Sequence, residues 1–338
     1  MEMKRTLINS IVNTAKDYEG IDFNYQHVET WLGQFPLEEH ELILTELNNI
    51  LSSSYLSKVN VIEYFDDLLD SDILFLEPIE NYCFINPQEI GGSQRDFMKI
   101  LDELMQKKHG VSIAECGQKN ITSYIYVDDA IYSGNRVIRD IQKWSEKIDD
   151  LTSVNRLDIV VIAFHDRNFD YVLSKLEECL PHTTINIWYG MKFSNSLKNS
   201  HSYFEGYWPS EELEYSDSAI DYIEAIDDTR SESQKNKIPL LRETGKPKND
   251  NFFTSLSNRR QVEKIFFEKG VQIVSYASNP NHNMRPMGYD YSKTLGFGSY
   301  LVTYRNIANN CPVVLWWGNP DSLSGINNWY PLFPRIIK

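Results

Sequence analysis

The chain has 338 residues, of which 41% are hydrophobic, 24% charged and 13% aromatic, a globular composition that suffices for one large domain or two to three small ones. The formal net charge of −15 argues against an extensive nucleic-acid groove, because phosphate binding needs a positive field. The sequence has no run of eighteen apolar residues, so a membrane span is not expected.

The four cysteines are scattered and do not form a C-x-x-C pair, and the seven histidines show no metal-ligand spacing. These patterns predict neither a disulfide framework nor a zinc site, and we expect no metal site built by the protein alone. We therefore expect a protein of the reducing cytoplasm.

Residues 1–72 are predicted to form a helical region. Apolar residues recur at helical spacing between Val28 and Phe35, and Pro36 then restarts the chain. Further apolar stripes follow at 42–51 and 61–69. We interpret this region as a small helical bundle, with a winged-helix-like or partner-docking module as the alternative.

Residues 73–200 are predicted to form an α/β core. Apolar strand patterns at 73–86, 123–129, 157–166 and 184–193 alternate with helical patterns. Such alternation is typical of a parallel sheet covered on both faces by helices. Right-handed crossovers then bring the carboxyl ends of the strands to one edge, where ligands bind.

Residues 201–338 are predicted to form a β-rich C-terminal extension that completes the core. Within it, residues 228–251 contain few apolar side chains and are predicted to form a mobile loop. A helix then ends at Gly270, and strands are expected at 271–278, 299–306 and 311–318. The aromatic residues of this region, Trp316, Trp317, Trp329 and Tyr330, could either stack on a base or pack in the core.

Residues 124–134 read "YIYVDDAIYSG" and carry the clearest chemical signal. We expect Asp128 and Asp129 at the carboxyl end of a central parallel strand, followed by a loop and the start of a helix. Carboxylates accept hydrogen bonds from vicinal hydroxyls, and the free N–H groups at a helix start hold a phosphate. The ligand that satisfies both has a ribose diol beside a 5′-phosphate, as in phosphoribosyl pyrophosphate (PRPP).

Here the chain resembles the phosphoribosyltransferase family, whose fingerprint is four hydrophobic residues, two acidic residues and a small-residue loop with Thr/Ser-Gly. The resemblance implies that Asp128 and Asp129 act as the catalytic pair by binding the ribose hydroxyls. It also implies a phosphate loop made of Ala130, Ile131, Tyr132, Ser133, Gly134 and Asn135. Arg136 departs from the family, which usually has Thr or Ser there; it could clamp phosphate or fill the pocket.

The family holds pyrophosphate in a second loop. The segment "GGSQ" has the expected position, with Gly91 and Gly92 able to let backbone amides approach an anion and Ser93 at a helix start. The alternative is that these four residues form an ordinary turn between a strand and a helix, without a ligand. At the predicted ligand edge, His165, Asp166 and Lys192 could bind ligand or simply face solvent.

More narrowly, the chain resembles the divergent phosphoribosyltransferase-like proteins of bacterial anti-phage systems. Some of those proteins occur in retron loci together with a reverse transcriptase. The stretches that carry the resemblance are "WLGQF", "GGSQ", "VDD", "LGFGSYLVTYRN" and "WYPLFPR". The resemblance implies an effector that binds PRPP or a related nucleotide with Mg²⁺ and acts at ribose C1. The alternative is a catalytically inactive module that senses a nucleotide or binds a defence partner such as a reverse transcriptase. A metal-dependent hydrolase ranks third, because the paired aspartates at this strand end do not have the D-x-D pattern of a phosphatase nucleophile.

Overall fold

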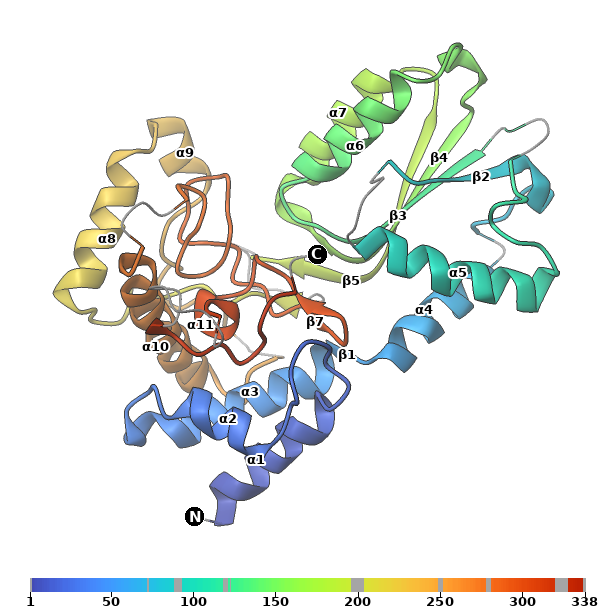
Figure 1. The fold of residues 1–338 in the computed structure, drawn as a ribbon. Helices are drawn as coiled ribbons and strands as arrows, with labels where there is room; N and C mark the ends of the chain where they lie inside the picture. The colour runs from blue at the N-terminus through green and yellow to red at the C-terminus, as the bar shows by residue number, and fades with distance from the viewer. Residues whose placement is uncertain are drawn as a thin grey trace. The chain divides into compact units, whose positions relative to one another are not determined.

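The computed structural model describes residues 2–71, 73–87, 93–117, 121, 123–195, 204–248, 252–277, 281–319 and 328–336. The chain divides into two compact units, one formed by Val59–Phe193 and the other by Met1–Lys58 with Ser194–Ile337. Each unit is described separately below (Figure 1). Among the described residues, none of the helices has the length and apolar character that crossing a membrane would need.

The unit of residues 59–193 is built on a parallel sheet in the order β2-β3-β4-β5. Its strands are β2 (Tyr82–Ile85), β3 (Ser123–Ile131), β4 (Arg156–His165) and β5 (Thr184–Ser194). Its helices are α4 (Lys58–Asp70), α5 (Ser93–His109), α6 (Asn135–Ser145) and α7 (Phe169–Cys179), with 3-10 turns η2 (Ile79–Asn81), η3 (Leu151–Ser153) and η4 (Asp166–Asn168). The predicted α/β class and its parallel sheet are confirmed.

Helices cover both faces of this sheet, as the apolar strands require. Figure 1 shows α6 and α7 together on one face and α5 on the other. Because successive strand residues point to opposite faces, Tyr124 and Tyr126 lie on the face of α6 and α7, whereas Ile125 and Val127 lie on the opposite face. The core under α6 and α7 includes Leu157, Ile159, Val161, Val137, Ile141, Val172 and Leu176.

The first two strands differ from the predicted bounds. Only Tyr82–Ile85 of the predicted 73–86 strand pairs, because Pro78 interrupts it and the turn η2 follows. In contrast, β3 runs past both aspartates to Ile131, which is buried and pairs with Phe164 of β4. The expected loop after Asp129 is therefore shorter than predicted.

The unit of residues 1–58 and 194–337 is mainly helical. Its N-terminal elements are α1 (Glu2–Thr14), α2 (Tyr25–Leu32), η1 (Leu37–Glu39), α3 (His40–Ser54) and β1 (Tyr55–Leu56). The later elements are β6 (Phe204–Glu205), α8 (Asp217–Asp228), α9 (Glu232–Lys237), α10 (Leu256–Ser275), β7 (Val302–Thr303), β8 (Asn306–Ile307) and α11 (Val313–Trp316). A small mixed sheet has the order β1-β7-β8, with β1 parallel and β8 antiparallel to β7.

The predicted strand at 271–278 is wrong: residues up to Ser275 continue α10. Gly270 does not end this helix. A Cβ atom at Gly270 would lie 2.8 Å from the Pro286 Cβ atom, so the glycine permits a close approach between helix and loop. Three of the last five helical positions are apolar and buried, which keeps the helix packed to its end.

The other predicted C-terminal strands are short or helical. The range 299–306 contributes only the two residues of β7 and the first residue of β8. Within the range 311–318, Val313–Trp316 form the single-turn helix α11, and Pro312 is its N-cap residue. Trp316 closes this turn by donating its indole N–H to the Cys311 carbonyl at 2.7 Å.

A buried ionic network joins distant segments of this unit. The Arg242 guanidinium lies 3.0 Å from Glu205 and 2.8 Å from Glu263, and Arg259 lies 2.7 Å and 3.0 Å from the same two carboxylates. All four side chains are buried. Two guanidinium groups and two carboxylates balance in charge, so each buried ion has its counter-ion nearby.

The predicted mobile loop at 228–251 includes α9, which begins with a capping box at Ser231, and the buried Arg242. Its mobility stays a prediction. If the loop is mobile, limited proteolysis should cut first within 228–251 and leave the remaining chain intact. First cleavage inside 120–195 would contradict this prediction.

Candidate functional site

Strand β3 places the two adjacent aspartates on opposite faces of the sheet. Asp128 lies on the face covered by α6 and is 2% exposed, whereas Asp129 lies on the opposite face and is half-buried. The Asp129 backbone N–H donates to Asp128 Oδ1 at 2.9 Å, and the Ala130 N–H donates to Asp129 Oδ1 at 2.9 Å. The repulsion between the two neighbouring carboxylates is reduced, because their side chains lie on opposite faces and each accepts a hydrogen bond from a backbone N–H.

Asp128 belongs to a buried polar cluster under α6. The Tyr126 hydroxyl lies 3.0 Å from Asp128 Oδ2 and 3.0 Å from Asp140 Oδ2, so one phenolic proton serves two carboxylates. Burial raises the pKa of Tyr126 far above its ordinary value, and the charges of Asp128 and Asp140 raise it further, which keeps the phenol protonated. The Arg136 Nε atom lies 3.8 Å from Asp128 Oδ2, and the Arg139 Nε atom lies 3.7 Å from Asp140 Oδ1.

Arg136, the residue that departs from the family pattern, therefore faces Asp128. Partial burial lowers its pKa, but the negative charges of Asp128 and Asp129 outweigh this and raise the pKa above its ordinary value. The side chain is half exposed, with a relative accessibility of 50%. It can accept an anion from solvent while it neutralises Asp128.

Tyr126→Phe is expected to destabilise the protein by about 1–3 kcal/mol, because two buried carboxylates lose their shared donor. Urea unfolding would measure the loss. Adding Asp140→Asn to this variant should restore part of the stability, since it removes one of the two charges. A double variant that is less stable than Tyr126→Phe would show that the phenol does not act by bridging these carboxylates.

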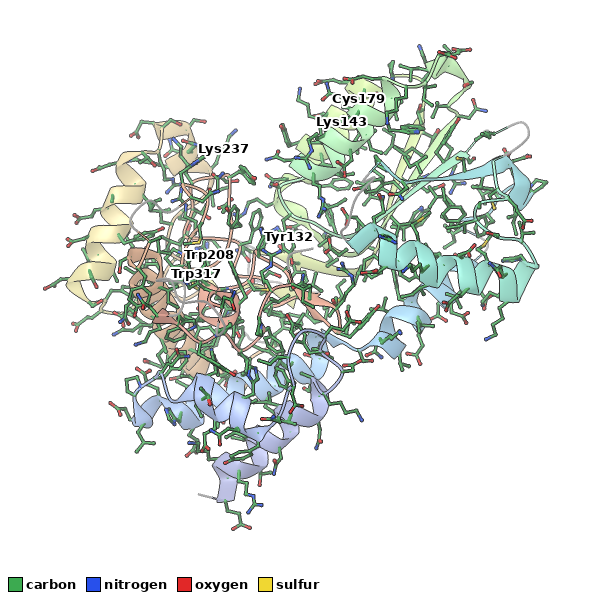
Figure 2. All side chains as sticks on the ribbon, viewed as in Figure 1. Tyr132, Lys143, Cys179, Trp208, Lys237 and Trp317 are labelled. Carbon is green, nitrogen blue, oxygen red and sulfur yellow. The ribbon has the colours of Figure 1, made fainter. Side chains whose placement is uncertain are left out.

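The loop between β3 and α6 consists of Tyr132, Ser133 and Gly134. Gly134 has φ +77, a left-handed conformation, and a Cβ atom there would lie 2.1 Å from Val172 Cγ2 of α7. Glycine is thus needed both for the backbone turn and for the packing of α7. The Asn168 side chain donates to the Tyr132 carbonyl at 3.1 Å and ties η4 to this loop (Tyr132 is labelled in Figure 2).

The predicted phosphate loop is only partly loop. Ala130 and Ile131 are paired residues of β3, and Asn135 and Arg136 are the first two residues of α6. The Asn135 N–H donates weakly to Ser133 Oγ at 3.4 Å. The start of an eleven-residue helix still follows the loop directly, as an anion site of this kind requires.

The second predicted loop lies mostly outside the described residues. Gly91 and Gly92 lie outside the described residues, and Ser93 is the first residue of α5. The pyrophosphate role of these three residues stays a prediction. Gln94, the next residue, is buried and donates to the Val127 carbonyl of β3 at 3.0 Å, which fixes the start of α5 beside the candidate site.

Strands β4 and β5 bring three further polar residues to the same edge. His165 ends β4, is buried, and accepts the Arg167 N–H at Nδ1 over 3.2 Å. The Lys192 Nζ atom of β5 lies 3.9 Å from Asp166 Oδ2, and the His165 ring lies 6.1 Å from the Tyr132 ring. The parallel register therefore gathers these side chains around the loop.

Sequence reasoning missed Tyr126, Asp140, Val172 and Asn168. Tyr126 stands two residues before Asp128, so strand alternation could have placed it on the same face. The remaining three come from helices or turns whose approach depends on packing. In the described part of the chain, His, Cys, Asp and Glu side chains do not form a group of three that could hold a metal ion.

The family model of PRTase-CE matches residues 28–335, which covers most of the chain. The chain belongs to the PRTase-CE family. Members of PRTase-CE are phosphoribosyltransferase-like proteins of conflict-system type, so the phosphoribosyltransferase-like character predicted from "YIYVDDAIYSG" is confirmed. No match was found among curated proteins or among solved structures.

For a PRTase-CE protein, the β3–α6 segment is the natural place to look for a ligand. A half-buried carboxylate, a three-residue loop and a helix start follow one another at the carboxyl edge of a parallel sheet. The roles predicted for the individual residues stay predictions, because the family match identifies the module and not its ligand.

Proposed function

We propose that this protein binds PRPP or a related nucleotide at the β3–α6 segment and acts at C1 of the ribose. One observation supports the proposal most strongly. At the carboxyl edge of the sheet of this PRTase-CE chain, Asp129 is followed by a short loop and then by the start of α6. Asp129 would accept the ribose hydroxyls, and the N–H groups at the start of α6 would receive the 5′-phosphate.

The two aspartates would then have different tasks. Asp128 is buried and engaged by Tyr126 and the Asp129 N–H, so it would position the strand end rather than bind hydroxyls. Asp129 is half-buried on the other face and would contact the ribose. This division refines the paired role that the family pattern implies.

Mg²⁺ would enter with the diphosphate of the ligand. Mg²⁺ usually keeps several waters and binds through one or two carboxylates plus phosphate oxygens. The carboxylates here fit that pattern, since Asp128 already has partners and the described residues do not offer a three-carboxylate cage. When bound, Mg²⁺ would neutralise the diphosphate as it leaves C1.

The protein's own contribution to catalysis would be electrostatic. Asp129 would orient the ribose, and its negative charge would stabilise the positive charge that develops on the ring as the bond at C1 breaks. Arg136 and the α6 N–H groups would hold the 5′-phosphate in place. The direct test is to incubate the protein with Mg²⁺ and either PRPP or nucleotide pools and to identify products by mass spectrometry.

Arg136→Ala is expected to weaken binding of Mg²⁺–PRPP by roughly 1.5–3 kcal/mol, the range of one charge-assisted pair. Isothermal titration calorimetry would measure the change. Arg139→Ala is the matched control, because this arginine lies on the same helix and pairs with Asp140. Tighter binding in Arg136→Ala would mean that the arginine fills the pocket.

A second candidate function is a binding module that has lost turnover and senses a nucleotide. The Arg136–Asp128 pair favours it, since an arginine at the loop replaces the small hydroxyl residue of the family pattern. In that case the mass-spectrometric assay would find no product, whereas isothermal titration calorimetry would still detect binding. The Asp129→Asn variant would still bind the ligand more weakly than the wild type.

We further propose that the protein acts as an effector in anti-phage defence, with a partner such as a reverse transcriptase. The conflict-system type of its family supports this role. Infection of cells that carry the protein with its neighbouring genes would test it. Protection that survives Asp129→Asn unchanged would separate the defence role from the proposed ligand site.

A further inference from the structure

Strand β5 is the last strand of the parallel sheet within the unit of residues 59–193, and its first seven residues are unusually exposed. None of residues 184–190 is buried, whereas every residue of β4 after Arg156 is buried. A strand with neighbours on both sides and helices over both faces would be buried along its length. Residues 184–190 therefore form an open edge of the sheet, and we call this stretch the β5 edge.

The backbone of the β5 edge presents hydrogen-bonding groups to an incoming strand. The Thr184 N–H donates to the Asn155 carbonyl at 2.9 Å, so the backbone groups of Thr184 face β4. Because these groups alternate in direction along a strand, those of Ile185, Ile187 and Tyr189 face away from β4. Within the described residues of this unit, the outward N–H and C=O groups of these three residues have no hydrogen-bond partner.

The sequence of the β5 edge, "TINIWYG", lacks the features that usually prevent strand pairing. It contains neither a charged residue nor a proline, and five of its seven residues are β-branched or aromatic. Exposed edge strands of natural proteins normally carry a lysine, a proline or a bulge, because an apolar edge pairs readily with other strands. The composition of this edge therefore favours pairing.

A groove of about 580 Å³ lies beside the β5 edge, on the face of the sheet that α5 covers. Ile73 and Leu76 are 52% and 66% exposed there. The Trp188 indole N–H donates to Asp158 Oδ1 at 2.8 Å, and the Arg156 Nε atom lies 2.7 Å from Asp158 Oδ2. The two opposite charges are thus paired, and the groove offers apolar side chains without a net charge. Its walls are Ile73, Leu76, Arg156, Thr184, Asn186 and Trp188.

The other face of the β5 edge also exposes apolar surface. The rings of Tyr189 and Phe169 each pack against the buried Phe164 ring, with centroids 5.4 Å apart in both cases. Tyr189 remains 41% exposed and Phe169 37% exposed. Apolar side chains that flank an open strand on both faces mark an interaction surface.

We propose that the β5 edges of two copies of this chain pair in antiparallel fashion about a two-fold axis at Ile187. Ile187 is the middle one of the three outward-facing residues, so this register places Ile187 opposite its symmetry mate and Ile185 opposite Tyr189. Each of these pairs exchanges two N–H···O bonds, and every outward group of the three residues gains a partner. Cross-strand pairs of a β-branched and an aromatic residue add further stability.

A second copy suits this edge better than a partner that is recognised by charge. Two chains with a net charge of −15 repel each other overall, but the β5 edge is uncharged and Arg156 is paired with Asp158, so like charges do not meet at the axis. In the same register, Trp188 of the second copy lies opposite Asn186 and beside the groove. A two-fold interface uses the same surface on both copies, so the association stops at the dimer.

Sedimentation velocity of the full chain tests the association. We expect a species of twice the chain mass of 39.4 kDa. Ile187→Lys places two like charges opposite each other at the axis, so this variant should sediment as a monomer, with its folding checked by circular dichroism. Ile220→Lys makes the same change at an exposed position of α8 in the other unit and should remain a dimer. A monomeric wild type, or an Ile187→Lys variant that is still a dimer, would overturn the proposal.

Cysteine cross-linking tests the register without introducing a charge. Hydrogen-bonded antiparallel pairs have Cα atoms about 5.5 Å apart, within the range for a disulfide. Oxidised Ile187→Cys should therefore form a disulfide between the two copies at position 187, which mass spectrometry of the linked peptides would identify. Thr184→Cys is the matched control, because the two copies of that position lie six residues out of register, roughly 20 Å apart. Absence of the disulfide at position 187, or a disulfide between the two copies at position 184, would contradict the proposed pairing.

Discussion

Gly134→Ala is expected to lower the free energy of unfolding by about 2–4 kcal/mol, through left-handed strain and overpacking together. The backbone at Gly134 has φ +77, which an alanine adopts only at a cost. The added Cβ atom would also lie 2.1 Å from Val172 Cγ2, so α7 or the loop must move. Urea unfolding of the purified variant would measure the effect.

Two variants divide that loss into its parts. Gly110→Ala has a similar φ of +69 and open space around the new Cβ atom, so it should cost only about 1 kcal/mol, from strain alone. Val172→Ala in the Gly134→Ala background removes the clashing methyl group and should recover part of the overpacking cost. Equal losses for Gly134→Ala and Gly110→Ala would show that packing against α7 is unimportant.

Asp129→Asn is expected to weaken Mg²⁺–PRPP binding about tenfold to a hundredfold, because charge-assisted hydrogen bonds to the ribose diol become neutral ones. Stability without ligand should stay close to that of the wild type, since asparagine keeps the oxygen that accepts the Ala130 N–H. Heating curves with and without the ligand would show a smaller ligand-dependent shift in Asp129→Asn than in the wild type at the same ligand concentration.

The two aspartates can be distinguished with single variants. In Asp128→Asn the amide can donate to the Tyr126 oxygen while the phenol donates to Asp140, so the buried cluster remains satisfied. We expect this variant to keep more ligand affinity than Asp129→Asn. Asp170→Asn, an exposed acid on α7, is the control that should change nothing. An unchanged ligand shift in Asp129→Asn would remove the ribose site from that residue.

The sequence could predict the parallel sheet because its signal is local. Apolar β-branched runs bounded by helical patterns require burial on both sides, and that requirement can be read from each segment without its neighbours. For the same reason, "YIYVDDAIYSG" could be placed on a strand, a loop and a helix start, and β4 ends at His165, one residue before the predicted end.

The secondary structure of the C-terminal region could not be predicted from local sequence patterns in the same way. Residues 271–275 have the composition of a strand, but they continue a helix that begins at Leu256 and packs through Gly270 against Pro286. Short apolar runs are compatible with either state, and long-range packing decides between them. The buried Arg242 likewise sits in a stretch whose composition predicts a loop.

For the candidate site, the sequence by itself determined which residues carry the charge and that a helix start follows them. Tertiary structure decided how far β3 runs, and this places Asp128 under α6 with Tyr126 and Asp140 and leaves Asp129 on the other face. The physical reason is that pairing with β4 extends the strand through Ile131, and an extended backbone sends adjacent side chains in opposite directions.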